Sequence, residues 1–240
     1  MFFRFFIIIC ICFSALNAQS LKIGTNPYYP PFEYYNFKGE IVGFDIDLLN
    51  EIAKRVKFNY TITNIAFDQL IPNLQANKID LAISAISQTA SREQFVDFSN
   101  PYFYTKNIYI KLNHDTTIKN KDDLNGKKIG VQSNTTQEIT AKQIKNAQII
   151  TNKYFATNVD LLKHGEIDAI IVDQAVGLEY LKQNPNLRVF YKENNKNEHF
   201  SIAFAKNRHE NLIKQINQAL QEIKFDGTYN KILKKYGLDK

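Results

Sequence analysis

The chain has 240 residues, of which 44% are hydrophobic and 22% are charged, and its formal net charge is +6 at pH 7. This is the composition of a globular protein with room for one large domain or two small ones, so disordered and fibrous chains are excluded. The lysines are interleaved with acidic residues, which favours solvated faces over a nucleic-acid surface.

The first 18 residues are typical of a secretory signal peptide. Arg4 precedes an apolar run from Phe5 to Phe13, and a short segment of small and polar residues ends at Ala18. The run is too short for a membrane span, which needs about 20 apolar residues. We therefore expect cleavage near Ala18 and a product outside the cytoplasm. Cys10 and Cys12 leave with the signal peptide, so disulfides and thiol chemistry are not expected in the mature chain.

The rest of the chain alternates between strand and helix patterns, which predicts an α/β fold. In chain order, the expected elements are strand 21–25, helices 44–56 and 67–76, strand 79–84, helix 89–95, strands 107–112 and 128–132, a helix from 136, strand 148–152, helix 159–163, strands 167–173, 188–191 and 201–205, and helices 210–225 and 229–236. Asp45 lies at the start of the helix 44–56, where the helix dipole favours a carboxylate.

Two short patterns occur twice in the chain. Lys22–Gly24 matches Lys128–Gly130, and the segment 74–80 matches the segment 162–168, each ending a helix and entering a buried strand. The repetition indicates two similar α/β lobes. Lobes of this type bind ligands at the carboxyl ends of their strands, which here would face one another across a cleft.

Polar residues follow these strand ends. The segment 84–91 leads into a helix whose first turn carries Arg92, so free backbone N–H groups and a guanidinium favour an anion there. The alternative is that Ser and Thr only cap the helix and Arg92 is a surface residue. Asp173 ends a buried strand and can either face the cleft or cap the next helix. The segment 134–137 offers a second polar turn, which is a weak signal by itself.

The usual signatures of catalysis and cofactor binding are absent from the sequence. The four histidines lack metal-binding spacing, and no GxSxG, GxxxxGK or GxGxxG motif occurs. No catalytic residue, metal site or cofactor is therefore expected.

The mature chain resembles the periplasmic solute-binding proteins of polar amino-acid ABC transporters, known as bacterial extracellular solute-binding protein family 3. The resemblance is carried by Tyr29–Glu33, Ile41–Leu48, Phe67–Leu74, Ile79–Asp80, Thr89–Arg92, Val96–Tyr102, Asp123–Val131 and Asp226–Tyr229.

This resemblance implies a type II binding-protein fold with two lobes and the ligand in the cleft between them. Lobe 1 would comprise residues 19–104 and 203–240, and lobe 2 would comprise residues 105–202. Two crossing strands near Thr105 and Ser201 would join the lobes, and hinge motion would close them around the ligand.

The resemblance also implies how a free amino acid is held. The residue matching Arg92, the Ser84–Ser87 turn and Thr136 would bind the α-carboxylate, and the residue matching Asp173 would bind the α-ammonium. Tyr29 and Phe67 would form the walls around the side chain. The expected ligand-binding residues are Asn26, Tyr29, Phe67, Ser84, Ala85, Ser87, Arg92, Gln132, Thr135, Thr136, Gln137 and Asp173.

The ligand's side chain would meet neutral amides, namely Asn26, Gln88, Gln132 and Gln137. Members that favour basic amino acids often have a carboxylate where this chain has Asn26, which disfavours a strong lysine or histidine preference. Arginine and glutamine remain the two favoured ligands.

We therefore expect a monomeric periplasmic receptor that passes an amino acid to an ABC permease and does not bind nucleic acid. The alternatives are an enzyme like the cyclohexadienyl or arogenate dehydratases, which resemble the same fold, and a surface adhesin or sensor. No histidine falls at a strand end to serve as a cleft acid or base, which disfavours the enzyme.

Overall fold

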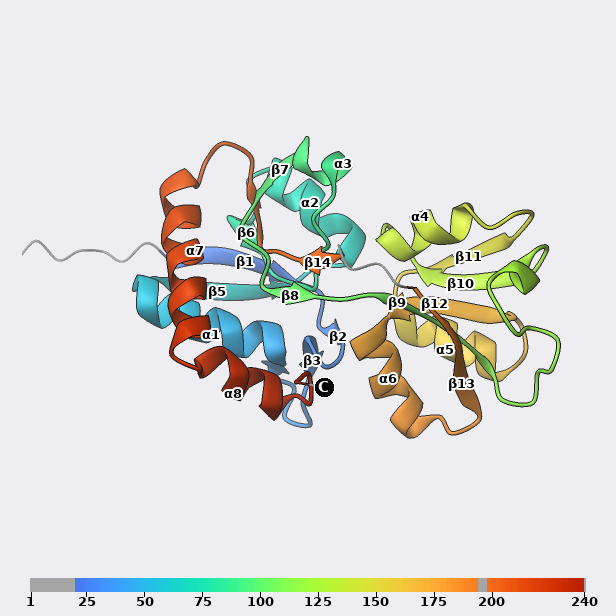
Figure 1. Ribbon diagram of the computed structural model, residues 1–240. Coiled ribbons are helices and arrows are strands. Elements are labelled where there is room, and N and C mark those ends of the chain that lie inside the picture. The colour runs from blue at the N-terminus through green and yellow to red at the C-terminus, as the bar shows by residue number, and fades with distance from the viewer. Residues whose placement is uncertain (1–19, 194–197, 240) are drawn as a thin grey trace, which may run out of the picture.

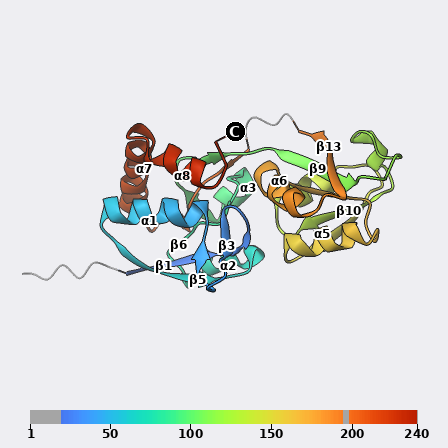
Figure 2. The same cartoon turned by 90° about the horizontal axis from the view of Figure 1, so that it is seen from below.

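A computed structural model describes residues 20–193 and 198–239, which form two α/β lobes lying side by side (Figures 1 and 2). The expected signal peptide lies outside the described residues. Among the helices that the structure describes, none is both long and apolar enough to cross a membrane.

The first lobe is built on a five-stranded sheet with the order β5-β1-β6-β15-β7. Its strands β5, β1 and β6 are parallel, whereas β15 is antiparallel to both of its neighbours. The strands are β1 (Ser20–Thr25), β5 (Asn59–Asn64), β6 (Leu81–Ala82), β7 (Val96–Phe98) and β15 (Ala203–Ala205), and the helices are α1 (Phe44–Val56), α2 (Phe67–Gln75), α3 (Ala90–Glu93), α7 (Glu210–Phe225) and α8 (Thr228–Lys235). A small sheet of β2 (Tyr28–Tyr29), β3 (Glu33–Tyr35) and β4 (Ile41–Val42) lies beside α1.

The second lobe repeats this arrangement with the order β11-β10-β12-β9-β13. Again the first three strands are parallel and the fourth is antiparallel to both neighbours. The strands are β9 (Asn107–Leu112), β10 (Lys128–Gln132), β11 (Gln148–Asn152), β12 (Ala169–Asp173) and β13 (Leu187–Lys192), and the helices are α4 (Thr136–Lys142), α5 (Phe155–Lys163), α6 (Gln174–Gln183) and a 3-10 turn at Asp122–Leu124.

The repeated sequence patterns occupy equivalent places in the two sheets. In the first lobe the backbone N–H of Lys22 donates to Oδ2 of Asp80 at 2.8 Å, and in the second the N–H of Lys128 donates to Oδ2 of Asp168, also at 2.8 Å. Each aspartate thus ties the start of one parallel strand to the segment that enters the next. The prediction of two similar lobes is confirmed.

Two chain segments cross between the lobes (Figure 1). Strand β8 (Phe103–Tyr104) pairs in antiparallel fashion with β14 (His199–Phe200). Strand β9 then continues from β8 into the second sheet, and β15 continues from β14 back into the first. The expected crossing near Thr105 and Ser201 therefore lies beside a paired hinge ribbon, while the lobe boundaries themselves stay a prediction.

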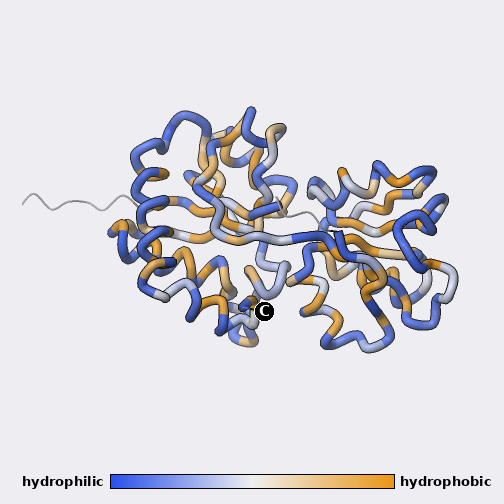
Figure 3. The backbone as a smooth tube through the Cα atoms, in the orientation of Figure 1, coloured by the Kyte–Doolittle hydropathy of each residue, from blue (hydrophilic) through white to orange (hydrophobic). Residues whose placement is uncertain are grey.

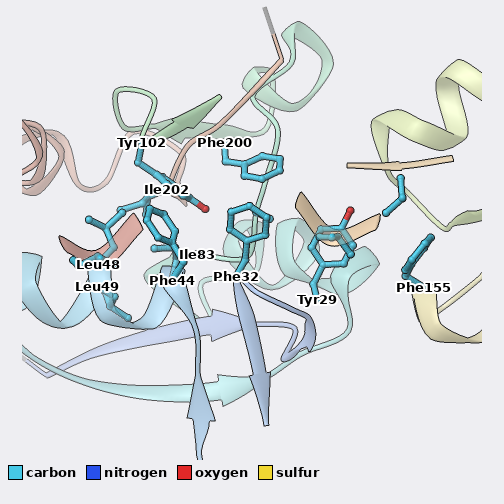
Figure 4. Close-up of a cluster of buried hydrophobic side chains, with 14 of the residues drawn as sticks. Tyr29, Phe32, Phe44, Leu48, Leu49, Ile83, Tyr102, Phe155, Phe200 and Ile202 are labelled. Atoms are coloured by element: carbon cyan, nitrogen blue, oxygen red, sulfur yellow. The ribbon is translucent and has the colours of Figure 1, made fainter. Parts of the chain in front are cut away.

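The hydrophobic stretches gather in the strands of the two sheets, and hydrophilic residues mark the outer loops and helix faces (Figure 3). In the first lobe an aromatic core reaches the hinge ribbon: the ring centre of Phe32 lies 5.0 Å from that of Phe103 and 5.1 Å from that of Phe200. Figure 4 shows this cluster with Tyr29 at its edge, on the side facing Phe155 of the second lobe. Core packing therefore fixes the segment that carries Tyr29 into the cleft.

The expected helices 44–56 and 210–225 have those bounds in the structure. The expected strand 79–84 is shorter, because only Leu81–Ala82 pairs before the chain turns into the cleft. Strand β5 was not predicted: it is a polar edge strand with no fully buried residue, so it lacks an apolar signal.

Replacing Gly43 with alanine is expected to lower the free energy of unfolding by about 3 kcal/mol. Gly43 has φ 136°, and an added Cβ would lie 2.1 Å from the carbonyl oxygen of Phe32. Gly39→Ala is the matched control, because Gly39 also has a positive φ of 75° but nothing lies within 4 Å of its added Cβ. Urea unfolding should show a loss of about 1 kcal/mol or less for the control. Equal losses in the two variants would contradict the steric explanation.

Candidate functional site

A cavity lies between the lobes, and it and the solvent at its mouth together comprise about 310 Å³ of empty space. Residues of the first lobe and of the second line it together: Asn26, Tyr29, Glu33, Phe67, Ala85, Ser87 and Arg92 on one side, and Gln132, Thr135, Thr136, Gln137 and Asp173 on the other. Eleven of these twelve residues were expected from the sequence, and Glu33 was not. Two expected residues are outside this lining: Ser84, and Gln88, which was expected to meet the ligand's side chain.

The lining residues stand at the carboxyl ends of parallel strands. Asn26 follows β1, Ala85 lies shortly after β6, and Gln132 and Asp173 are the last residues of β10 and β12. Carboxyl ends of adjacent parallel strands meet at one edge of a sheet, and the two edges here face each other. The topology thus gathers residues that are up to 147 positions apart between Asn26 and Asp173.

Arg92 spans the cleft from the first lobe. Its Nη1 donates to the carbonyl oxygen of Ser87 at 2.7 Å, and its Nη2 donates to the carbonyl oxygen of Asn134 in the second lobe at 2.7 Å. Its guanidinium also lies 5.4 Å from the ring centre of Phe67. A guanidinium has five N–H donors, so three remain for an anion in the cavity. The surface alternative for Arg92 is therefore wrong, although Thr89 does cap α3.

Burial lowers the pKa of Arg92 to about 10, although the carboxylates of Glu198 and Asp173 act to raise it. The side chain is still cationic at neutral pH. A partly desolvated cation of this kind binds a carboxylate more strongly than an exposed one.

Asp173 faces the cavity from the second lobe. Its Oδ2 accepts hydrogen bonds from the hydroxyl of Tyr29 at 2.6 Å and from Nε2 of Gln137 at 3.1 Å. Its other oxygen, Oδ1, is buried, and the hydroxyl of Thr105 also acts on this carboxylate as a hydrogen-bond donor. Asp173 occupies the N-cap position of α6 but makes no capping bond with its side chain. The capping alternative is thus wrong, and the buried carboxylate lines the cavity.

Burial, followed by the charge of Glu198, raises the pKa of Asp173 to about 7. An aspartate in the unfolded chain releases its proton near pH 4. Between these values the folded protein binds more protons than the unfolded chain at this residue. The contribution of Asp173 to the free energy of unfolding therefore falls as the pH rises from about 4 to 7.

We expect the stability of Asp173→Asn, measured as its free energy of unfolding minus that of wild type, to depend on pH. In the absence of amino acids this difference should be about 2 to 4 kcal/mol more favourable at pH 8 than at pH 4. Urea unfolding at the two pH values measures this difference. Asp160→Asn is the control, because it removes the same charge from the same lobe but at a side chain that is 68% exposed. A stability difference between Asp173→Asn and wild type that does not change with pH would contradict the expectation.

Two further carboxyl groups hold the turn beneath the cavity. Oε1 of Glu33 accepts from the hydroxyl of Ser84 at 2.8 Å, and Oδ2 of Asp45 accepts from the backbone N–H of Ala85 and the hydroxyl of Tyr102, both at 2.8 Å. Ala85 has a left-handed φ of 45°, which the bond from Asp45 helps to hold. The sequence placed Asp45 at a helix start for the dipole alone, whereas the structure uses it to support the turn.

Burial raises the pKa of both groups, that of Asp45 to about 6 and that of Glu33 well above its usual value. The charge of Asp45 adds to the effect of burial on the pKa of Glu33. The carboxyl group of Glu33 therefore holds its proton to a higher pH than an exposed glutamate does.

The remaining expected residues differ in how free their polar groups are. The Thr135 hydroxyl donates to the carbonyl oxygen of Gln132 and accepts from the N–H of Glu138, so it serves as the cap of α4. Ser84 lies behind the lining, where its hydroxyl accepts from the N–H of Asn26 at 3.0 Å.

The amide side chains expected around the ligand's side chain are also engaged. Asn26 donates to the carbonyl oxygen of Ile65 at 3.1 Å, and Gln132 donates to that of Lys153 at 3.1 Å. The expectation for Gln88 is wrong: it lies outside the cavity lining, and its Nε2 donates to Glu93 instead.

Sequence reasoning missed one acidic residue entirely. The side chain of Glu198, from the second crossing segment, accepts hydrogen bonds from Ser87 and Thr136. It lies just before a two-residue strand, so neither periodicity nor a motif identified it. In residues 20–193 and 198–239, no group of three or more His, Cys, Asp or Glu side chains is arranged to hold a metal ion.

Comparison with known proteins identifies the family of the chain. Residues 21–239 match the model of the bacterial extracellular solute-binding proteins, family 3. A probable histidine-binding protein of Campylobacter jejuni is 46% identical over 94% of this chain and 88% of its own. The ABC transporter arginine-binding protein 1 of Escherichia coli is 36% identical over 92% of this chain and 91% of its own.

The fold agrees with this assignment. A solved structure of an ancestral arginine-binding protein bound to glutamine superimposes with a TM-score of 0.84 and 37% sequence identity, covering 91% of this chain and 98% of that one. The described part of the chain has the lobes, the crossing ribbon and the interlobe cavity of a type II binding protein. The chain belongs to family 3 of the bacterial extracellular solute-binding proteins.

Proposed function

We propose that this protein is an extracytoplasmic receptor that captures a free L-amino acid in the cavity and delivers it to the permease of an ABC transporter. One observation carries the proposal: a cation with spare donors, Arg92, and a buried carboxylate, Asp173, line the same cavity from opposite lobes. A zwitterion supplies one partner for each.

The position of the two charges on different lobes couples binding to closure. The α-carboxylate of the ligand would bind Arg92, and the α-ammonium would donate to Oδ1 of Asp173. Both bonds form at once only when the lobes are close together. The ligand therefore binds the closed form more tightly than the open form, and this difference in affinity shifts the hinge equilibrium toward the closed form.

The candidate ligands are arginine, histidine and glutamine. Relatives named for arginine and histidine binding support the first two, and the ancestral structure bound to glutamine supports the third. Asn26, at a position where members that favour basic amino acids often have a carboxylate, argues against histidine. The name of the relative that is 46% identical argues for it.

The cellular setting is proposed on the same basis. The protein would act in the periplasm as a monomer after cleavage of residues 1–18, hinged at the boundaries 104/105 and 202/203, without binding nucleic acid. The family model describes extracellular proteins, which supports export. N-terminal sequencing of the exported protein should begin near Gln19.

We propose no catalytic step. The carboxyl groups of the cavity already have structural partners, Ser84 for Glu33 and Tyr29 for Asp173. The relatives named above are binding proteins. Turnover of arogenate or prephenate by the purified protein would contradict this proposal and favour the dehydratase alternative.

A thermal-shift panel tests the function. The mature protein is incubated with each of the twenty amino acids, ornithine and citrulline, and unfolding is followed with an external dye because the chain has no tryptophan. Binding adds about RT ln(1 + [L]/Kd), or about 4 kcal/mol at a thousandfold excess. We expect a clear shift with one or two of arginine, histidine and glutamine. No shift with any amino acid, in folded protein freed of carried-over ligand, would refute the receptor function.

A further inference from the structure

Glu198 places a further acidic side chain beside the cavity, where it bonds to the lining residues Ser87 and Thr136, and its backbone is held in the hinge. Its carbonyl oxygen accepts a hydrogen bond from the backbone N–H of Thr105 at 2.9 Å, which joins the two crossing segments. The next residue, His199, pairs with Tyr104 in the ribbon of β8 and β14. The side chain of Glu198 therefore enters the cleft from a fixed point that belongs to neither sheet.

The Glu198 carboxylate bridges the lobes. Its Oε1 accepts from the hydroxyl of Ser87 in the first lobe at 3.4 Å and from the hydroxyl of Thr136 in the second lobe. Each hydroxyl has a single hydrogen to donate. While both hydroxyls serve Glu198, neither can donate to a second carboxylate.

The same carboxylate lies in the electric field of the ligand-binding charges. Its negative charge acts to raise the pKa of Arg92 and contributes to the raised pKa of Asp173. Glu198 is thus close to the cation that a ligand carboxylate needs, and it already holds two hydroxyls beside that cation.

We propose that Glu198 is an internal competitor for the α-carboxylate subsite of Ser87, Thr136 and Arg92, which an incoming amino acid must displace. The proposal rests on the receptor function proposed above. In the structure Glu198 bridges the lobes through Ser87 and Thr136, as a bound carboxylate would. The measured affinity is then lowered by the fraction of free protein in this self-bound form. When the ligand displaces the Glu198 carboxylate, the side chain that moves is attached to the hinge ribbon. Binding of the ligand in the cleft is therefore linked directly to the hinge.

Glu198→Gln is expected to tighten L-arginine or L-histidine binding by about tenfold, because a neutral amide competes less well than a carboxylate for hydroxyl and guanidinium donors. Glu198→Asp keeps the charge but shortens the side chain, and it is expected to tighten binding as well. Glu166→Gln is the matched control, because it removes the same charge from an exposed residue. Glu166 precedes the first residue of β12, whereas the cavity lies at the other end of this strand. Its affinity is expected to equal that of wild type.

Isothermal titration calorimetry on the mature proteins, with folding checked by circular dichroism, measures these affinities. Agmatine and histamine, the decarboxylated analogues of arginine and histidine, lack the competing group. Their binding is expected to gain nothing from Glu198→Gln. Unchanged or weaker amino-acid binding in Glu198→Gln would overturn the proposal and indicate that the carboxylate attracts a cationic ligand. An equal gain for the analogue would overturn it too, because the effect would not depend on the carboxylate subsite.

Binding by the wild-type protein tests the receptor function, and the Glu198 variants test the competition, so the two claims can be refuted separately. Wild-type protein that binds none of the twenty amino acids, ornithine or citrulline would refute the receptor function, and the competitor role with it. Wild-type protein that binds normally, alongside Glu198 variants that bind no more tightly, would leave the receptor function intact and refute only the competition.

Discussion

Replacing Arg92 with methionine is expected to weaken amino-acid binding by about 30- to 5,000-fold, corresponding to about 2 to 5 kcal/mol. Methionine has a similar length but no charge and no donors. The ligand's α-carboxylate would then be buried without its cation, and the hydrogen bonds of Arg92 to Ser87 and Asn134 would be lost as well. Titration calorimetry with the amino acid that gives the largest thermal shift measures the effect.

Arg208→Met is the control for charge alone, because Arg208 is exposed on the first lobe. Its affinity should match that of wild type. Arg92→Lys separates charge from geometry: lysine keeps the positive charge but has no planar fork, so an intermediate loss is expected. Wild-type affinity in Arg92→Met would show that the carboxylate binds elsewhere in the cleft.

Replacing Asp173 with asparagine is expected to cause a loss of similar size. The substitution keeps the shape and one acceptor but removes the charge that would pair with the α-ammonium, so a buried ligand cation would lose its partner. The free variant should nevertheless be more stable than wild type at pH 8, because the buried carboxylate is no longer present. Weaker binding in a more stable protein distinguishes a ligand contact from a structural role.

The wild-type affinity should also depend on pH through Asp173. Its pKa of about 7 means that the carboxyl group takes up a proton as the pH falls below neutral, and the protonated group does not balance an ammonium. Affinity should therefore decrease from pH 7 to pH 5, by at most tenfold per pH unit. In Asp173→Asn this part of the pH dependence should vanish. An equally steep pH dependence in Asp173→Asn would assign it to another group.

The local elements were predictable wherever the sequence has a strong period. The helices at 44–56 and 210–225 present apolar residues at helical spacing, and the repeated Lys-Ile-Gly and Ile-Asp patterns identified equivalent strands in the two lobes. Short or polar strands were not predictable. Strand β5 buries little, and β14 has only two residues, so tertiary pairing rather than local pattern makes them strands.

Some residues of the candidate site could likewise be predicted from the sequence, and others could not. Residues in recognisable motifs at strand ends, such as Arg92 and Asp173, were expected to meet and do so. Gln88 was expected to face the ligand but bonds to Glu93 and Ser201, and these partners have no signature in the local sequence. Glu198 was missed because its importance comes from a neighbour more than 60 positions away, Thr136, and not from its own surroundings in the chain.

The sequence by itself determined the α/β order, the duplication of the lobes and the types of residue at the strand ends, because apolar periodicity and motifs are local properties. Only the tertiary structure decided which polar groups are free. Thr135 is used as a helix cap, Asn26 and Gln132 bond to carbonyl oxygens, and Asp173 accepts from Tyr29 and Gln137. The physical reason is that burial and hydrogen-bond partners depend on chain crossings at the hinge, which bring distant segments together and have no local signature in the sequence.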